Sequence, residues 1–161
     1  MIEPSQLVSS IILPVVKELN LDRGRERDVV ALLLYTVKQE SDCGRYIKQL
    51  GGGPACGPWQ VEKRTYSDCI DNYLKYRREL LSCVLDASYC DRMPPAEGMI
   101  GNLYLNCAIA RIVYRRCPAP IPKYDDLDGM WNIYKRFYNT YEGAAERNEF
   151  LHNCKEMLKY I

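Results

Sequence analysis

The chain has 161 residues, of which 47% are hydrophobic and 27% are charged. This length and composition fit one compact domain spanning residues 1–161. Twenty-two basic residues against twenty-one acidic ones leave a net charge of +1. The balance excludes the large uniform field that proteins binding nucleic acid or anionic membranes usually carry. We therefore expect no nucleic-acid partner.

The beginning of the chain does not have the pattern of an export signal. Glu3 and Pro4 stand where such a signal carries basic residues, and the apolar run at residues 11–13 is broken by Pro14. No stretch is apolar enough for long enough to predict a membrane-spanning helix. We expect a protein made without a signal peptide and without a membrane span.

The cysteine pattern argues against a zinc site. No two cysteines form a CxxC pair, and His152 is the single histidine, whereas structural zinc usually needs close ligand pairs. We expect no metal and no cofactor. Free buried thiols are the favoured interpretation, and disulfides formed in an oxidising compartment are the alternative. The eight cysteines are Cys43, Cys56, Cys69, Cys83, Cys90, Cys107, Cys117 and Cys154.

Hydrophobic residues recur at helical spacing along most of the chain, which predicts a mainly α fold. The strongest amphipathic segment is residues 26–40, where Val29, Leu33 and Val37 fall on one stripe. Residues 42–63 are rich in glycine and predict a loop or small irregular hairpin. The other predicted helices are 4–19, with a kink or end at Pro14; 65–86, capped by Thr65; 96–116; 125–138; and 144–160.

Two further groups of side chains predict structure more than function. Tyr114, Tyr134 and Tyr138 lie at helical spacings typical of packing in the core or at its rim. Arg25 and Arg115 lie near predicted helix ends, where solvated or dipole-compensating arginines are common.

Glu40 continues the apolar stripe of residues 26–40 and directly precedes the glycine-rich segment. Its carboxyl is therefore expected to point into the protein at the edge of a cleft. Desolvation raises the pKa of a carboxyl, and a general acid needs such a pKa to donate a proton near neutral pH. The alternative is a helix-end carboxylate that faces solvent or pairs with Lys38 or Arg45.

A longer motif follows Glu40. Gln39-Glu40-Ser41 is succeeded by Gly51-Gly52-Gly53-Pro54-Ala55-Cys56-Gly57-Pro58-Trp59-Gln60 and, five positions later, by Thr65. This order resembles the lysozyme-like lytic transglycosylases, in which a helix ends in Glu-Ser, a Gly-x-x-Gly-x-x-Gln element follows, and a Thr opens the next helix. It is most similar to small lysozyme-motif proteins of bacteriophage structural gene clusters, which also carry a segment like residues 131–140 followed by Gly-Ala-Ala.

The resemblance implies a lysozyme-like helical domain with Glu40 as its acid/base. Glu40 would protonate the oxygen between N-acetylmuramic acid and N-acetylglucosamine, and then help the muramoyl 6-hydroxyl close a 1,6-anhydro ring. This chemistry needs one carboxylate. A hydrolase usually has a second carboxylate that activates water, and Glu62 is the nearest candidate.

The same resemblance implies roles in substrate binding for the residues around Glu40. Gln60 would line the cleft, and Gly57 would let the backbone approach the sugar closely. Trp59 would either stack on a sugar face or anchor the core. Ser41 would hydrogen-bond the turn after the helix and support Glu40, and Tyr104 would line the cleft from a later helix.

Two functions remain open from the sequence. The first is a virion-carried enzyme that is made in the host cytoplasm and opens peptidoglycan glycan strands at the host cell wall. The second is a noncatalytic virion or tail protein that keeps the fold and binds other phage virion proteins, favoured by the departure at Pro58, where the family usually has an apolar residue. An endolysin released from the cytoplasm is a third, less favoured interpretation.

Overall fold

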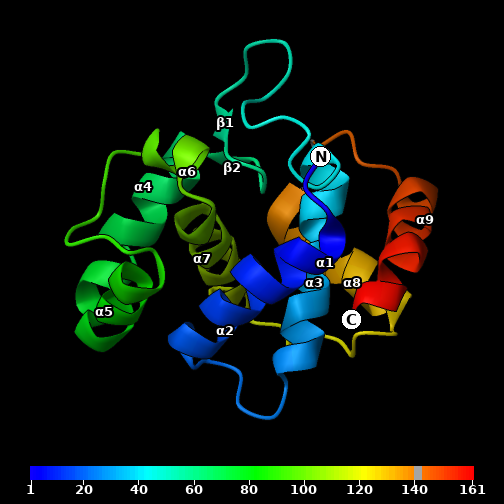
Figure 1. Ribbon diagram of the computed structural model, residues 1–161, viewed down its shortest axis with the longest axis horizontal. Coiled ribbons are helices and arrows are strands. Elements are labelled where there is room, and N and C mark those ends of the chain that lie inside the picture. Colours follow the sequence, from blue (N-terminus) through cyan, green and yellow to red (C-terminus); the bar gives the residue numbers. More distant parts are fainter. Residues whose placement is uncertain (140–142) are drawn as a thin grey trace.

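A computed structural model describes residues 1–139 and 143–161. Thr140, the last residue of the motif at 131–140, lies outside the described residues. The chain is mainly helical, as predicted, with a single two-stranded sheet in the described part (Figure 1). The buried apolar side chains form one continuous core. None of the described helices is long and apolar enough to cross a membrane.

The first helical stretch consists of α1 (Pro4–Leu7), a π-helical turn η1 (Val8–Ile12) and α2 (Leu13–Leu19), which follow one another without a break. Pro14 lies in the first turn of α2, where a proline is tolerated because its missing N–H would lack a helical partner anyway. The helix therefore continues past Pro14, and the distortion expected there takes the form of the wider π turn before it.

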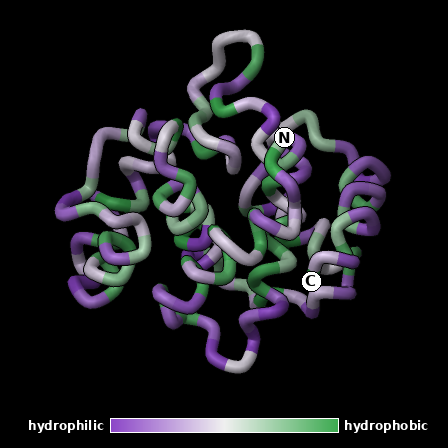
Figure 2. The backbone as a smooth tube through the Cα atoms, in the orientation of Figure 1, coloured by the Kyte–Doolittle hydropathy of each residue, from purple (hydrophilic) through white to green (hydrophobic). Residues whose placement is uncertain are grey.

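Helix α3 (Glu26–Ser41) lies at the centre of the fold, and its nine residues 29–37 are all buried. It packs against α2, against α7 (Leu103–Arg115) and against α9 (Arg147–Met157). Figure 2 shows hydrophobic residues along α3 and hydrophilic residues in the turn that joins it to α2. Burial on several sides explains why the sequence of α3 is almost entirely apolar over residues 29–37.

A small hairpin follows α3. Strand β1 (Ala55–Cys56) pairs antiparallel with β2 (Val61–Glu62), with Ala55 opposite Glu62 and Cys56 opposite Val61. This agrees with the irregular hairpin predicted within residues 42–63. The loop before β1 projects from the body of the molecule (Figure 1).

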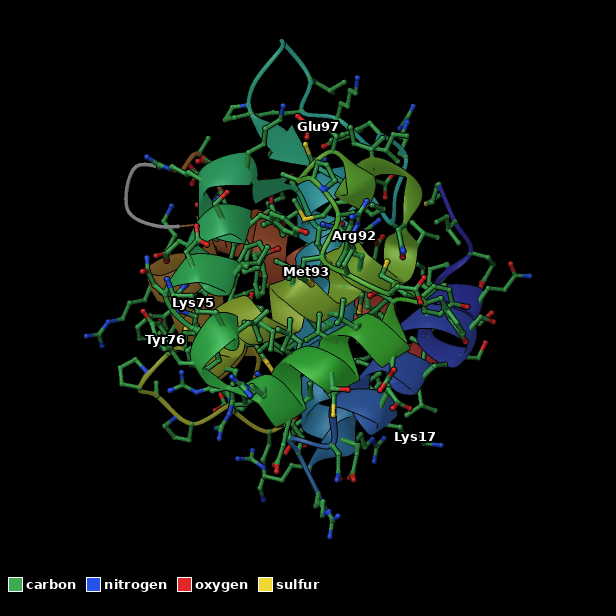
Figure 3. The ribbon with its side chains drawn as sticks, turned by 90° about the vertical axis from the view of Figure 1, so that its left-hand side faces the viewer. Lys17, Lys75, Tyr76, Arg92, Met93 and Glu97 are labelled. Carbon is green, nitrogen blue, oxygen red and sulfur yellow. The ribbon has the colours of Figure 1, made fainter. Side chains whose placement is uncertain are left out.

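The prediction of a single helix over residues 65–86 is wrong. The structure has α4 (Lys63–Asp71), a 3-10 turn η2 (Leu74–Tyr76) and α5 (Arg78–Ala87). The break allows Leu74 to enter the core, while Lys75 and Tyr76 project into solvent (Figure 3). The predicted cap at Thr65 is also wrong, because α4 already begins at Lys63 after an extended Glu62.

The helix predicted for residues 96–116 is likewise divided, into α6 (Gly98–Gly101) and α7. Asn102 separates them in an extended conformation and caps α7 by accepting a hydrogen bond from the Leu105 amide. The chain ends with α8 (Leu127–Tyr134), a π-helical turn η3 (Lys135–Asn139), α9 and a 3-10 turn η4 (Leu158–Tyr160).

The cysteines are free thiols in this structure. Five are buried and behave as small core side chains: Cys43, Cys56, Cys69, Cys107 and Cys154. Burial raises the pKa of the Cys43 thiol to about 11, which keeps it protonated at neutral pH. No cluster of potential metal ligands occurs among the described residues.

Candidate active site

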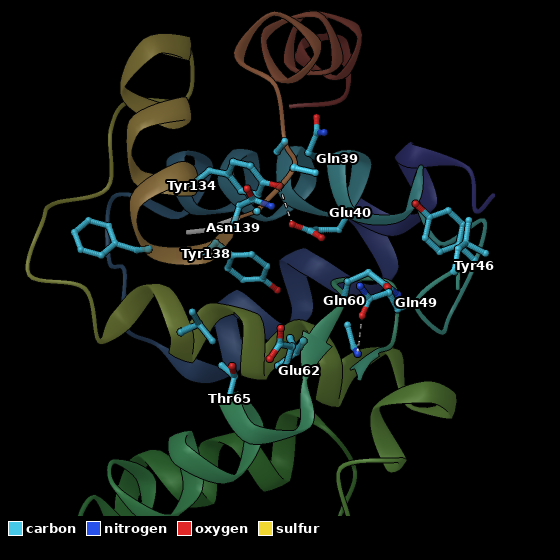
Figure 4. Close-up of a pocket in the computed structure, with 18 of the residues that line it drawn as sticks. Gln39, Glu40, Tyr46, Gln49, Gln60, Glu62, Thr65, Tyr134, Tyr138 and Asn139 are labelled. Carbon is cyan, nitrogen blue, oxygen red and sulfur yellow. Dashed lines mark hydrogen bonds between the residues drawn. The ribbon is translucent and has the colours of Figure 1, made fainter. Parts of the chain in front are cut away.

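A cleft of about 570 Å³ opens beside the C-terminal end of α3. This volume is in the range of sites that bind small molecules. In Figure 4, Glu62 and Thr65 lie across the cleft from Glu40 and Tyr134. Its walls come from α3, the loop before β1, the β1–β2 hairpin, the start of α4, α7, α8, η3, and α9 with the segment before it. The polar side chains that line it are Gln39, Glu40, Tyr46, Gln49, Gln60, Glu62, Arg64, Thr65, Tyr134, Tyr138, Asn139 and Glu149.

Glu40 occupies the last turn of α3 and faces this cleft. Burial raises the pKa of its carboxyl to about 7, and this effect outweighs the opposing one of a hydrogen bond from the Tyr134 hydroxyl. No cation pairs with Glu40 among the described residues, since Lys38 pairs with Asp42 and Glu156, and Arg45 pairs with Asp42. The alternative of a solvated or ion-paired Glu40 is therefore wrong.

The Tyr134 hydroxyl donates to Oε1 of Glu40 over 2.8 Å. Burial raises the pKa of Tyr134, so the hydroxyl stays protonated and remains a donor. A neutral donor stabilises the carboxylate less than a cation would, which leaves the carboxyl easy to protonate.

Tyr138 connects this side of the cleft to the hairpin. Its ring stacks on those of Tyr114 and Tyr134, with centroids 5.0 and 6.2 Å away. Its hydroxyl donates to the carbonyl oxygen of Trp59 over 2.7 Å. The packing expected for these tyrosines is confirmed. In addition, the Tyr134 hydroxyl contacts Glu40, and the Tyr138 hydroxyl binds the hairpin on the other side of the cleft.

Asn106 fixes the turn of the hairpin from α7. Its Oδ1 accepts from the Trp59 amide over 2.8 Å, and its Nδ2 donates to the Cys56 carbonyl over 3.2 Å. Gly57 lies against this side chain with φ +72°, and a Cβ at Gly57 would overlap both Asn106 and the Met99 carbonyl. Glycine is required at this position because its backbone lies against the Asn106 side chain and the Met99 carbonyl. Gly57 does not line the cleft, contrary to the role expected from the resemblance.

Gln60 does line the cleft, in a left-handed conformation with φ +47°. Its Nε2 donates to the Gly57 carbonyl over 2.7 Å, which holds the side chain in place. Trp59 points the other way. It is fully buried, and its indole N–H donates to the Leu33 carbonyl over 2.9 Å, so it anchors the core and is not placed to stack on a sugar.

The remaining predicted site residues lie in different surroundings. Ser41 is buried, and its Oγ accepts from the Gly44 amide over 2.8 Å, which confirms the expected contact with the turn after the helix. Glu62 lines the cleft and pairs with Arg64 over 2.7 Å. Tyr104 does not line the cleft; its ring packs edge-on against Tyr89, with centroids 5.2 Å apart.

Sequence reasoning did not identify three residues of this site. Tyr134 and Tyr138 lie four positions apart on one helical face, a spacing that was interpreted as packing only. Asn106 is a polar residue on the otherwise apolar face of α7. A buried amide side chain in such a position indicates hydrogen bonds to the backbone of another segment. Neither pattern indicates which distant segment is the partner.

Comparisons with known protein families, with curated proteins and with solved structures found no match for this chain.

Proposed function

We propose that the protein cleaves peptidoglycan glycan strands in the manner of a lytic transglycosylase, with Glu40 as acid and base. The observation that carries the proposal is the surroundings of Glu40. A largely buried carboxyl with a pKa of about 7 faces a polar cleft, held by a neutral tyrosine hydroxyl. Such a group exchanges a proton readily at neutral pH.

In the proposed reaction, protonated Glu40 gives its proton to the glycosidic oxygen that follows N-acetylmuramic acid, and the bond from that oxygen to C1 breaks. The resulting Glu40 carboxylate then takes the proton of the muramoyl 6-hydroxyl, whose oxygen bonds to C1 and closes the 1,6-anhydro ring. One carboxyl performs both transfers. Glu62 is engaged by Arg64, which favours this route over hydrolysis with Glu62 as a second catalytic carboxylate.

The uncharged polar side chains in the lining of the cleft suit the hydroxyl and acetamido groups of a glycan. Four amide side chains reach it from four segments, and each offers both donors and acceptors to hydroxyl and acetamido groups. These are Gln39, Gln49, Gln60 and Asn139. The Gln60 amide is already oriented by its hydrogen bond to the Gly57 carbonyl.

The test is digestion of purified peptidoglycan by the wild type, Glu40→Gln and Glu62→Gln, with the released muropeptides analysed by mass. We expect 1,6-anhydro products from the wild type, a loss of about 10²- to 10⁴-fold in Glu40→Gln, and retained activity in Glu62→Gln. Retained activity in Glu40→Gln would refute the assignment. Reducing ends as products, together with an inactive Glu62→Gln variant, would instead indicate a hydrolase.

The proposal extends to location, on the resemblance to phage proteins alone. The enzyme would be carried in the virion beside other virion proteins and act at the host cell wall. Mass spectrometry of purified particles tests this. If the folded wild type releases no product yet is present in particles, the enzymatic proposal fails and the noncatalytic virion protein replaces it.

A further inference from the structure

A second cavity lies beside the turn between α2 and α3, at the end of the molecule opposite the loop that precedes β1 (Figure 1). Its volume is about 170 Å³. One water molecule occupies roughly 30 Å³ in the liquid, so the cavity holds a small polyatomic group and not a sugar chain. The cavity and the Glu40 cleft share no lining residue among those described.

Three arginines from different parts of the fold line this cavity. Arg25 precedes α3, whereas Arg111 and Arg115 lie one turn apart on α7. Two carboxylates compensate part of their charge, because Asp22 pairs with Arg111 and Asp28 pairs with Arg25. The five groups together leave one positive charge.

Arg115 carries this remaining charge. It is exposed, and no carboxylate of the described residues forms an ion pair with it. Its neighbour in the chain, Arg116, is by contrast paired with Asp68 over 2.6 Å. An exposed guanidinium with no intramolecular partner is available to an external anion.

Arg111 supplies an independent sign that the cavity lacks a partner. Its side chain is buried, and Nε and Nη2 donate to the two oxygens of Asp22 over 2.9 and 2.6 Å. Its Nη1 is buried without any hydrogen-bond acceptor among the described residues. A buried donor left unpaired costs about 1–3 kcal/mol. Because Arg111 lines the cavity, an acceptor bound there would lie beside the guanidinium that carries this unpaired donor.

We propose that this cavity binds a tetrahedral oxyanion of the phosphate type through Arg111 and Arg115. Guanidinium groups match the oxygens of such ions in geometry and charge. The volume of about 170 Å³ accommodates the phosphate group itself. Free phosphate and a phosphate ester on a larger molecule share this chemistry.

Inorganic phosphate is the first probe, titrated against the full chain at constant ionic strength with chloride as the replaced anion. We expect saturable binding by calorimetry and a rise in Tm, since a ligand that binds only the folded state stabilises it. Glycerol phosphate, titrated in the same way, distinguishes an ester from the free ion. Tighter binding of glycerol phosphate would favour an esterified ligand, equal affinity would show that the site accepts both, and exclusion of the ester would restrict it to free phosphate.

Two variants that each remove one positive charge identify the site. Arg115→Gln is expected to weaken phosphate binding by about tenfold or more, the loss of one charge-assisted hydrogen bond. Arg78→Gln removes the same charge from an exposed position on α5 and is expected to leave binding unchanged. Glu40→Gln should also bind phosphate normally, which separates this site from the proposed activity. Absence of saturable binding in the folded wild type, or equal weakening in Arg115→Gln and Arg78→Gln, would overturn the proposal.

Discussion

Asp22 and Glu40 are both largely buried carboxyls, but their surroundings differ. Asp22 receives two hydrogen bonds from the Arg111 guanidinium, and the two side chains are 9% and 3% exposed. Glu40 forms no ion pair with any described residue and accepts from the Tyr134 hydroxyl. The charge of Asp22 is compensated by the Arg111 guanidinium, whereas burial raises the pKa of Glu40 to about 7.

Asp22 therefore has a structural role, whereas Glu40 is a carboxyl that can donate and accept a proton. A paired charge inside a protein stabilises only as long as both partners are present. An unpaired carboxyl costs stability whenever it is ionised, and a protein gains from keeping one only where the proton is used. Asp22→Asn should therefore lower the stability of the protein, whereas Glu40→Gln should raise it.

The largest effect is expected for Asp22→Asn, which keeps the shape of the side chain but leaves Arg111 buried without a counter-charge. We expect the free energy of unfolding in urea to fall by about 3–5 kcal/mol. Asp86→Asn is the matched control, because Asp86 is exposed on α5 and has no ion-pair partner among the described residues. A loss in Asp22→Asn no larger than in Asp86→Asn would show that the buried pair has no special role.

Glu40→Gln is expected to stabilise the protein, and only at high pH. An ordinary carboxyl pKa of 4.5 describes the unfolded chain, and about 7 the folded one. Between these values the unfolded state loses its proton first, so wild-type stability falls as pH rises from about 4.5 to 7 and then stays low. The neutral glutamine does not incur this cost, which amounts to about 3 kcal/mol above pH 7.

Urea unfolding of the wild type and Glu40→Gln at pH 4 and pH 8 measures this difference. The variant should gain stability relative to the wild type only at pH 8. Glu62→Gln is the control, since the Glu62 carboxylate is paired with Arg64 at the cleft edge and its replacement should not produce such a pH-dependent gain. Equal stabilisation by Glu40→Gln at both pH values would mean that the carboxyl is not held protonated.

The position of Glu40 was predictable because its cause is local. The apolar stripe of residues 26–40 and the following glycines place this carboxyl at the inner face of a helix end, and the raised pKa follows from burial. The hairpin was predictable for the same reason. The helix breaks at Asn102 and around Leu74 were not predicted, because no glycine or proline lies near Leu74 and the single Gly101 before Asn102 does not by itself end a helix.

The sequence also could not show which distant residues form hydrogen bonds with the site residues. Tyr134 lies 94 positions from Glu40, and Asn106 lies 47 positions from Trp59. Periodicity shows which face of a helix is buried but not which residue it meets. For Gly57, the sequence predicted a close approach to the backbone, yet the groups that approach it in the structure belong to α6 and α7.

The pH dependence of peptidoglycan cleavage should follow the protonation of Glu40. Because the first step needs the protonated carboxyl, the rate of product release should fall above pH 7, by about tenfold per pH unit. A ¹³C NMR titration of the Glu40 carboxyl measures the same pKa without reference to activity. A midpoint below pH 5 would contradict the picture of an uncompensated buried carboxyl.

The smallest effect is expected for Tyr134→Phe, which removes the single hydrogen bond seen on Glu40 and keeps the buried ring. That bond lowers the pKa of Glu40, so its loss should raise the pKa further and shift the fall in activity to higher pH. Tyr138→Phe removes a hydroxyl of the same stack that binds the Trp59 carbonyl. It should leave the NMR midpoint of Glu40 in place, even if the rate changes. A shift of equal size in both variants would assign the effect to loosened packing around the cleft, and the Tyr134 hydroxyl would lose its role in setting the acidity of Glu40.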